Sequence, residues 1–314
     1  MSPIDRYDSH CHFSPRITEE VFTKEVVPHL MNQEWPINLM MTNHIDEPLV
    51  TTLVDMNPNV MANVGIHPWF THLYTFEADI SKEDHYHKVL EKYSKNWKYD
   101  HPITEFTRFL PDPIPIHATL KRFKATLLGC SFVNVGEIGI DKSARVPRCG
   151  FLGNTETGDI AGLSNYKVSM EHQLRVLLAI LDIVAEVGVK SVSIHCVNAH
   201  GILYDVLKPL NFANKIPRIV MHSYSGSVEM AKMLLKLKNV DIWFGLSDYV
   251  NLGRSNIREI VFCTREKLLV ETDLGVDTMG ESHGKTIDLV VSKLEALGVD
   301  RNTLMDNWIR FNSH

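Results

Sequence analysis

The sequence predicts an α/β fold in which eight parallel strands close into a TIM (β/α)8 barrel. Short apolar segments alternate with longer helical segments eight times along the chain, and this alternation indicates a parallel sheet. Most of the short segments are continuously apolar, as expected of strands that are covered on both faces. No Gly-x-Gly-x-x-Gly motif follows the first strand, which argues against an open dinucleotide-binding sheet.

The eight predicted strands are rich in Val, Ile, Leu and Met. They are Ile4–Asp8, Ile37–Thr42, Val60–Ile66, Phe132–Ile140, Ser191–Cys196, Arg218–His222, Asp241–Leu246 and Lys267–Thr272.

Helical segments with apolar residues at three- and four-residue spacing separate these strands. They are Glu19–Asn32, Leu49–Met56, Met170–Val187, Ala199–Leu207, Val228–Leu237, Ile257–Cys263 and Thr286–Leu297. The spacing is clearest in Met170–Val187, and Gly188 directly after it is suited to ending a helix.

The length of 314 residues fits one barrel domain with additions. A typical barrel takes about 250 residues, so we expect a single domain over residues 1–314 that carries about 64 extra residues. Two segments between strands are too long for a helix and two short loops, at about residues 67–131 and 142–166. Because they follow the carboxyl ends of strands, these insertions are predicted to cover the catalytic face.

Composition and charge exclude several classes of protein. Apolar residues form 44% of the chain and charged residues 22%, which is typical of a globular protein and excludes disorder and a disulfide scaffold. The net charge of −6 argues against a broad basic surface for nucleic acid, so contacts to DNA are expected to be local. With no apolar leader and no run of about 18 apolar residues, we expect a cytoplasmic or nuclear protein without membrane contact.

Potential metal ligands gather at the ends of the predicted strands. His10 and His12 share one face of the first strand, because side chains of a strand alternate. Other strands end in further candidates, which are Glu137, His195, His222 and Asp273. In a closed barrel these ends share one rim, so all six side chains can meet there. A buried carboxylate costs several kcal/mol unless it is paired or bound to metal, which favours a cation site.

The number of ligands predicts two divalent ions. Six groups exceed the roughly four ligands of a zinc site and suit two ions that share one carboxylate. Glu137 comes from the middle of the strand order and is the natural bridge. Four imidazoles favour zinc or another transition ion, with magnesium or manganese as the alternative. Such ions, about 3.5–4 Å apart, stabilise the attacking and leaving oxygens of a displacement.

Taken in order, the motifs resemble those of the TatD-type metal-dependent hydrolases in the amidohydrolase superfamily. They are Asp-Ser-His-Cys-His-Phe at 8–13, Gly-Ile-His-Pro at 65–68, Gly-Glu-Ile-Gly-Ile-Asp at 136–141, Ile-His-Cys at 194–196, His-Ser-Tyr-Ser-Gly-Ser at 222–227 and Glu-Thr-Asp at 271–273. Asn302–Phe311 is also similar to the last helix of that family. The resemblance implies a TIM barrel with two divalent ions that hydrolyses phosphodiester bonds in DNA, often as an exonuclease.

The resemblance also implies residue roles. Two ligand groups would share Glu137: His10, His12 and Asp273 in one, and His195 and His222 in the other. Asp273 would also take the proton of the nucleophilic water. His67, in the Gly-x-His-Pro motif, would contact the substrate phosphate.

Two segments depart from the family pattern. The family usually has Arg two residues after the fifth-strand histidine, where this chain has Val197. Leu274–Val276 replaces the usual segment with Pro and Tyr or Arg. Both changes remove expected contacts to phosphate or substrate, and the nearby Arg145 and Arg148 are candidates to replace them.

These departures leave three functions open. The first is hydrolysis of DNA, and the second is hydrolysis of a small ester, lactone or phosphate by the same core. The third is a barrel used mainly to bind a protein partner through its insertions, against which the complete ligand set argues.

Two smaller points concern single residues. Asp141 either orients a metal ligand or starts a turn. Histidines in polar segments are expected to be solvated, namely His85, His87, His101, His117 and His283.

Overall fold

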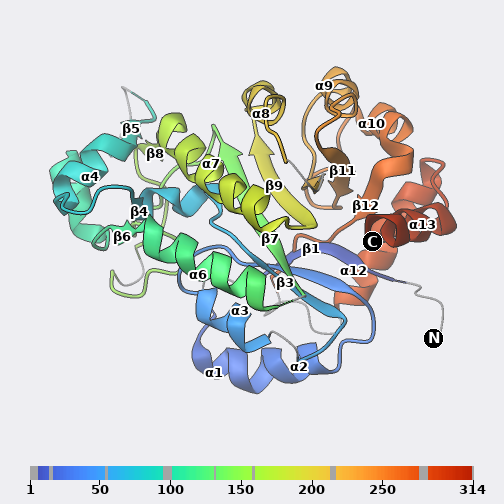
Figure 1. Cartoon of the computed structure of the whole chain (residues 1–314), viewed down its shortest axis with the longest axis horizontal. Coiled ribbons are helices and arrows are strands. Elements are labelled where there is room, and N and C mark those ends of the chain that lie inside the picture. The colour runs from blue at the N-terminus through green and yellow to red at the C-terminus, as the bar shows by residue number, and fades with distance from the viewer. Residues whose placement is uncertain are drawn as a thin grey trace.

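The computed structural model of the chain contains one sheet of eight parallel strands surrounded by helices (Figure 1). It describes residues 6–13, 17–53, 56–94, 101–130, 132–157, 160–212, 217–275 and 282–312. In sheet order the strands are β1 Asp8–His12, β2 Ile37–Met40, β3 Val60–Val64, β7 Val133–Asp141, β9 Ser191–Val197, β10 Arg218–Met221, β11 Asp241–Leu246 and β12 Leu268–Val270. Every predicted strand has a counterpart in this sheet, although Ile4 lies outside the described residues.

The first and last strands close the ring. The amide of Asp273 donates to His10 O at 3.0 Å, and the amide of His12 donates to Leu274 O at 2.9 Å. Ser9 Oγ adds a bond to Val270 O at 2.9 Å. These bonds join β1 to the segment that begins with β12, so the predicted barrel is confirmed.

Helices lie between the strands largely where the apolar spacing predicts them. They are α1 Glu19–Val21, α2 Val27–Met31, α3 Glu47–Leu53, α7 Met170–Val187, α8 His200–Leu207, α9 Val228–Leu234, α10 Ile257–Thr264, α12 Ser282–Ala296 and α13 Arg301–Asn312, with the short η4 Arg265–Lys267. Gly188 ends α7 with a φ of 71°, as predicted. Among the described helices, none combines the length and hydrophobicity that crossing a membrane requires.

The first predicted helix is interrupted by a π-helical segment, η1 Phe22–Val26, between α1 and α2. The amide of Val27 donates to Phe22 O, five residues back. The next residue, Pro28, has no amide hydrogen to donate and cannot continue a regular α-helical ladder there. The proline therefore accounts for an irregularity that apolar spacing alone does not predict.

The chain between β3 and β7 carries a set of extra elements. They are η2 Pro68–Leu73, β4 Tyr74–Thr75, α4 Lys82–Val89, β5 Leu90–Lys92, α5 Ile103–Phe106, η3 Thr107–Phe109, β6 Ile114–Pro115 and α6 Ile116–Gly129. Figure 1 shows the short elements gathered on one side of the barrel, with α6 beside α7. β5 pairs with β8 Tyr166–Val168, so the two long segments predicted as insertions contact each other.

Three buried histidines donate hydrogen bonds to backbone carbonyls, and these bonds hold the segments together. His72 Nε2 donates to Gly150 O at 3.0 Å, and His85 Nε2 donates to His72 O at 2.8 Å. His172 Nε2 donates to Thr71 O at 2.9 Å. The expectation that His85 and His283 are solvated was wrong, since each is only 2% exposed. Each instead has a specific buried partner, which the sequence does not reveal.

Asp8 joins three elements at the closing seam. Its Oδ1 accepts the amide protons of His10 and Thr272, both at 3.0 Å. Its Oδ2 accepts from Thr272 Oγ1 at 2.5 Å and from His283 Nε2, on α12, at 2.8 Å. This carboxylate is fully buried, so its hydrogen bonds connect β1, the end of β12 and α12 without competition from water.

Replacing Asp8 with alanine is expected to lower the free energy of unfolding by about 3–5 kcal/mol, because buried donors lose their acceptor. Urea denaturation of the metal-free protein measures this change. Asp288→Ala is the matched control, since Asp288 joins the same helix to Arg6 at 2.7 Å but is partly exposed. That variant should lose at most about 1 kcal/mol, and equal losses from the two variants would contradict the prediction.

Candidate metal centre

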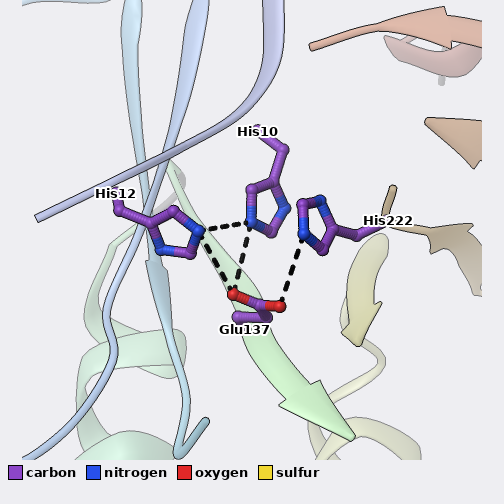
Figure 2. Close-up of side chains that lie close together, drawn as sticks. All are labelled: His10, His12, Glu137 and His222. Atoms are coloured by element: carbon purple, nitrogen blue, oxygen red, sulfur yellow. Dashed lines mark hydrogen bonds and ion pairs between the residues drawn. The ribbon is translucent and has the colours of Figure 1, made fainter. Parts of the chain in front are cut away.

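The other five residues predicted as ligands lie around the carboxylate of Glu137, which lies on β7 and is 1% exposed. His10 and His12 project from β1, and His222 follows β10 (Figure 2). His195 projects from β9. Asp273 follows β12, with its side chain 21% exposed. Because all these positions are at the carboxyl ends of barrel strands, the fold brings them to one rim.

One carboxylate oxygen of Glu137 faces the two histidines of β1. Oε2 lies 3.4 Å from Nε2 of His10 and 3.4 Å from Nε2 of His12. The two Nε2 atoms are 3.1 Å apart, which follows from their shared face of the strand. His12 Nε2 also lies 2.8 Å from Oδ1 of Asp273.

The other oxygen of Glu137 faces one histidine from β9 and two that follow β3 and β10. Oε1 lies 2.8 Å from Nδ1 of His195 and 3.4 Å from Nε2 of His67. His222 Nε2 is 3.6 Å from this oxygen and 3.6 Å from Oδ1 of Asp273. His222 therefore lies between the carboxylates of Glu137 and Asp273. His67, which is predicted to contact substrate, thus lies directly beside the predicted metal ligands.

Further polar residues contact the opposite nitrogens of the histidine rings. Nδ1 of His10 lies 2.8 Å from Ser193 Oγ, and Nδ1 of His222 lies 3.1 Å from Oε1 of Glu271. Gly245 leaves room for Glu271, because a Cβ atom there would lie 1.9 Å from its Oε2. Such partners orient the rings of metal-binding histidines. Neither role is predicted from the sequence, although Ser193 shares a strand face with the candidate ligand His195.

Asp141 begins a turn and also contacts His195, one of the predicted metal ligands. Its Oδ1 accepts the amide protons of Ser143 and Ala144 at 2.7 and 3.0 Å, and so begins a turn. Its Oδ2 lies 3.2 Å from Nε2 of His195 and accepts the indole proton of Trp69 at 2.8 Å. The Asp141 carboxylate thereby orients the rings of both His195 and Trp69.

The donor set fits divalent metal ions. Two groups of described residues bring ligand atoms within 4.8 Å of one another: His10, His12, Glu137 and His222, and His67, Glu137 and His195. Oε2 of Glu137 is buried and receives no hydrogen bond of normal geometry from the described residues. A buried anionic oxygen without a donor, surrounded by imidazole nitrogens, is an environment that a cation satisfies.

The charges of the site oppose the effect of burial. Burial raises the pKa of Glu137, but the neighbouring His67, His222 and His10 outweigh it and hold this pKa well below its usual range. Burial lowers the pKa of His222, but Glu271, Glu137 and Asp273 raise it to about 10. The pKa of His195 rises to about 9, because its bonds to Asp141 and Glu137 outweigh burial. The metal-free site therefore holds protons at neutral pH.

Metal binding is expected to release about two protons per chain near neutral pH, because a ligating imidazole must be unprotonated. His195 and His222, whose pKa values rise to about 9 and 10, account for these two protons, and His12, whose pKa is also raised, adds to the release. Metal affinity should therefore increase with pH until these groups lose their protons in the metal-free protein. Calorimetric titration in buffers of different ionisation enthalpy measures the release. An affinity that does not change between about pH 6.5 and 8.5 would contradict the prediction.

A cavity of about 610 Å³ opens above these residues. Glu137, His195, His222 and Asp273 contribute to its lining. Neither Arg145 nor Arg148 is among the lining residues. The guanidinium of Arg145 donates instead to Ser164 O, with Nε at 3.0 Å, and Arg148 lines a separate cavity of about 260 Å³. The suggestion that these arginines replace missing phosphate contacts is not supported by this arrangement.

The family model described as TatD related DNase matches residues 7–297. This chain belongs to the TatD family of DNases. As a TatD-family member it is a metal-dependent hydrolase that acts on phosphodiester bonds, as the resemblance of its motifs implies.

Relatives of the TatD-family protein include two yeast proteins. An uncharacterized deoxyribonuclease of Saccharomyces cerevisiae is 29% identical over 246 residues, covering 76% of this chain and 74% of that protein. The Cut9-interacting protein scn1 of Schizosaccharomyces pombe is 27% identical over 303 residues, covering 85% of each chain.

Solved structures of TatD homologues share the fold. The homologue YjjV of Escherichia coli has a TM-score of 0.61 at 16% identity, with 98% of each chain covered. The TatD-family hydrolase of Entamoeba histolytica has a TM-score of 0.55 at 12% identity, covering 98% of this chain and 99% of that one. At these identities the likeness supports the barrel fold.

Proposed function

We propose that this TatD-family hydrolase is a deoxyribonuclease that removes nucleotides from a DNA end with the help of two divalent ions. The observation that carries the proposal is the pair of environments around Glu137. Its Oε2 faces His10 and His12, whereas its Oε1 faces His195. A carboxylate with ligands on both of its oxygens is suited to bridging two cations.

The ligands divide into two groups that share Glu137. His10, His12 and Asp273 belong with Oε2, and His195 belongs with Oε1. The resemblance assigns His222 to the second group, but its ligand atom also lies close to those of His10 and His12. It can therefore serve either ion. Imidazole nitrogens outnumber carboxylates in this set, which favours zinc or another transition ion over magnesium.

Asp273 is suited to accept the proton of the attacking water. Bound divalent ions would supply the polarisation of the phosphoryl oxygen and would lower the pKa of that water. The carboxylate of Asp273 lines the cavity and is partly exposed, so water can reach it. Burial raises its pKa, but His222 and His12 outweigh burial and lower it below its usual range. Asp273 is therefore ionised at neutral pH, which is the state that a general base requires.

His67 is suited to donate a hydrogen bond to a phosphate oxygen. The amide of Trp69 donates to Nδ1 of His67 at 3.1 Å, so that nitrogen is unprotonated. Burial lowers the pKa of His67, and its neutral ring must therefore carry the proton on Nε2. Nε2 points into the site, 3.4 Å from Oε1 of Glu137. A protonated nitrogen can bind substrate oxygen, but it cannot bind a metal ion.

The proposal is tested with purified protein and end-labelled DNA. We expect two metal ions per chain, loss of label from one DNA end with zinc, manganese or magnesium, and no loss with a chelator. Stable DNA at every divalent ion, together with hydrolysis of small esters, lactones or phosphate monoesters, would favour the alternative substrate class. Internal cuts without end trimming would contradict exonuclease action.

A protein partner remains the second alternative, and the name of the Schizosaccharomyces pombe relative motivates it. Purified chain with Glu137→Gln distinguishes this role from catalysis. A partner that binds the variant and the unchanged protein equally would support a function that is independent of the metal site.

A further inference from the structure

The cavity above the metal centre has a charged floor and largely apolar walls. Its walls include Phe13, Trp69, Phe70, Leu152, Val197 and Tyr249. Among the described residues that line it, none is Lys or Arg. A site that binds along a DNA backbone needs cationic side chains for successive phosphates. The walls of this cavity consist instead of aromatic and aliphatic side chains, which can stack on a base.

Trp69 presents a fixed ring to this cavity. Its side chain belongs to η2, directly after the Gly-x-His-Pro motif, and the residue is 42% exposed. The indole nitrogen donates to Oδ2 of Asp141 at 2.8 Å, the same oxygen that contacts His195. The ring centroids of Trp69 and His67 are 4.8 Å apart at an angle of 77°. The hydrogen bond and this edge contact set the plane of the indole before substrate binds.

Tyr249 presents a second ring on the turn after β11. It is 92% exposed, and it also lines the cavity. The turn itself is held in place, because Oδ1 of Asn251 accepts the amide proton of Ser247 at 2.8 Å. Nδ2 of the buried Asn251 donates to Tyr224 O at 2.8 Å. A fixed backbone thus carries a fully accessible aromatic side chain at the mouth of the site.

The two rings come from opposite sides of the barrel rim. Trp69 follows β3 and Tyr249 follows β11, and these strands are four positions apart in the eight-strand order. The cavity between them measures about 610 Å³, within the range of pockets that bind small organic ligands. That volume is suited to one nucleotide unit and not to a duplex, whose full width cannot enter.

We infer that Trp69 and Tyr249 bind the base beside the scissile bond, and that the enzyme selects a nucleotide-sized, base-bearing phosphodiester by stacking and not by successive phosphate contacts. This inference rests on the proposed function. Val197 is consistent with it, because this lining residue has an apolar side chain that cannot donate a hydrogen bond to phosphate. Stacking of one base on an aromatic side chain changes affinity by about fivefold to a hundredfold.

The dependence of KM on salt concentration and on DNA length tests whether the site lacks contacts to successive phosphates of the DNA backbone. KM is measured for a thymidine dinucleotide and a thymidine 20-mer over a range of salt concentrations, with saturating metal. We expect similar KM values per end, and a slope of log KM against log salt below about 1, since each phosphate contact adds about 0.7. The measurement counts every phosphate contact, including any from residues outside the described ranges. A slope of about 3 or more, with a far lower KM for the 20-mer, would overturn the inference.

Substrates that lack one base, and protein variants that lack one aromatic ring, test the stacking contact directly. Dinucleotides with an abasic sugar on one side or the other of the scissile bond identify the base that is bound. We expect one of them to have a KM higher by about fivefold to a hundredfold. Trp69→Leu and Tyr249→Leu should each reduce this difference, whereas Trp69→Phe and Tyr249→Phe should retain most of it. The phenylalanine variant of Trp69 also removes the bond to Asp141, so it separates the ring from its hydrogen bond.

Phe262→Leu is the matched control, because Phe262 is 87% exposed on α10 and does not line the cavity. Equal KM values for base-bearing and abasic substrates would overturn the inference while leaving the proposed function intact. No hydrolysis of any of these phosphodiesters at any divalent ion would overturn the proposed function itself.

Discussion

Glu137→Gln is expected to remove metal binding and hydrolysis together. The substitution keeps the size of the side chain but removes its negative charge and replaces one ligand oxygen by an NH2 group, which is a donor only and cannot bind a cation. Since both oxygens of Glu137 face histidines, the change affects both sides of the site. We expect kcat to fall by at least about a thousandfold, as for charged groups that act as one catalytic unit.

Metal content after gel filtration and steady-state kinetics measure the two effects. Glu259→Gln is the matched control, because Glu259 is an exposed carboxylate of α10. Circular dichroism and urea denaturation establish that the Glu137 variant is folded. A folded Glu137→Gln protein with its full metal content and activity would exclude the bridging role.

Asp273→Asn is expected to reduce kcat by about a hundredfold to ten-thousandfold, the contribution of a positioned general base. The amide has the shape of the carboxylate but cannot accept the proton of the attacking water. Its contact with Nε2 of His12, at 2.8 Å, is also weakened, so metal affinity should fall as well. The loss of kcat should persist at saturating metal, because it concerns proton transfer and not occupancy of the site.

Glu271→Gln provides the comparison that separates these effects. Glu271 contacts Nδ1 of His222 at 3.1 Å and does not line the cavity. Its removal should lower metal affinity by about tenfold to a hundredfold, and excess metal should restore most of the activity. Kinetics over a range of metal concentrations measure both variants. Full recovery of Asp273→Asn in excess metal would show that Asp273 acts as a ligand alone.

The barrel could be predicted because its signals are local. Each strand is a short apolar run, and β11 has the predicted ends, Asp241–Leu246. α7 likewise has the predicted ends, Met170–Val187, because its apolar face repeats regularly and Gly188 ends it. The chain from about 67 to 131 is predicted only as an insertion, and its longest helix, α6, is not predicted. Most of its other elements are short, and their stability depends on contacts with distant segments, such as the pairing of β5 with β8.

The candidate site also has features that the sequence predicts and features that it does not. The sequence by itself determined which chemical groups gather at the rim, because strand alternation aligns His10 with His12 and barrel closure collects the strand ends. Only the tertiary structure decided how they are used. In the folded chain His67 contacts Glu137, and the buried His283 contacts Asp8. Arg145 donates to the carbonyl of Ser164 and does not line the cavity. These outcomes depend on packing between residues far apart in the chain, which local spacing does not record.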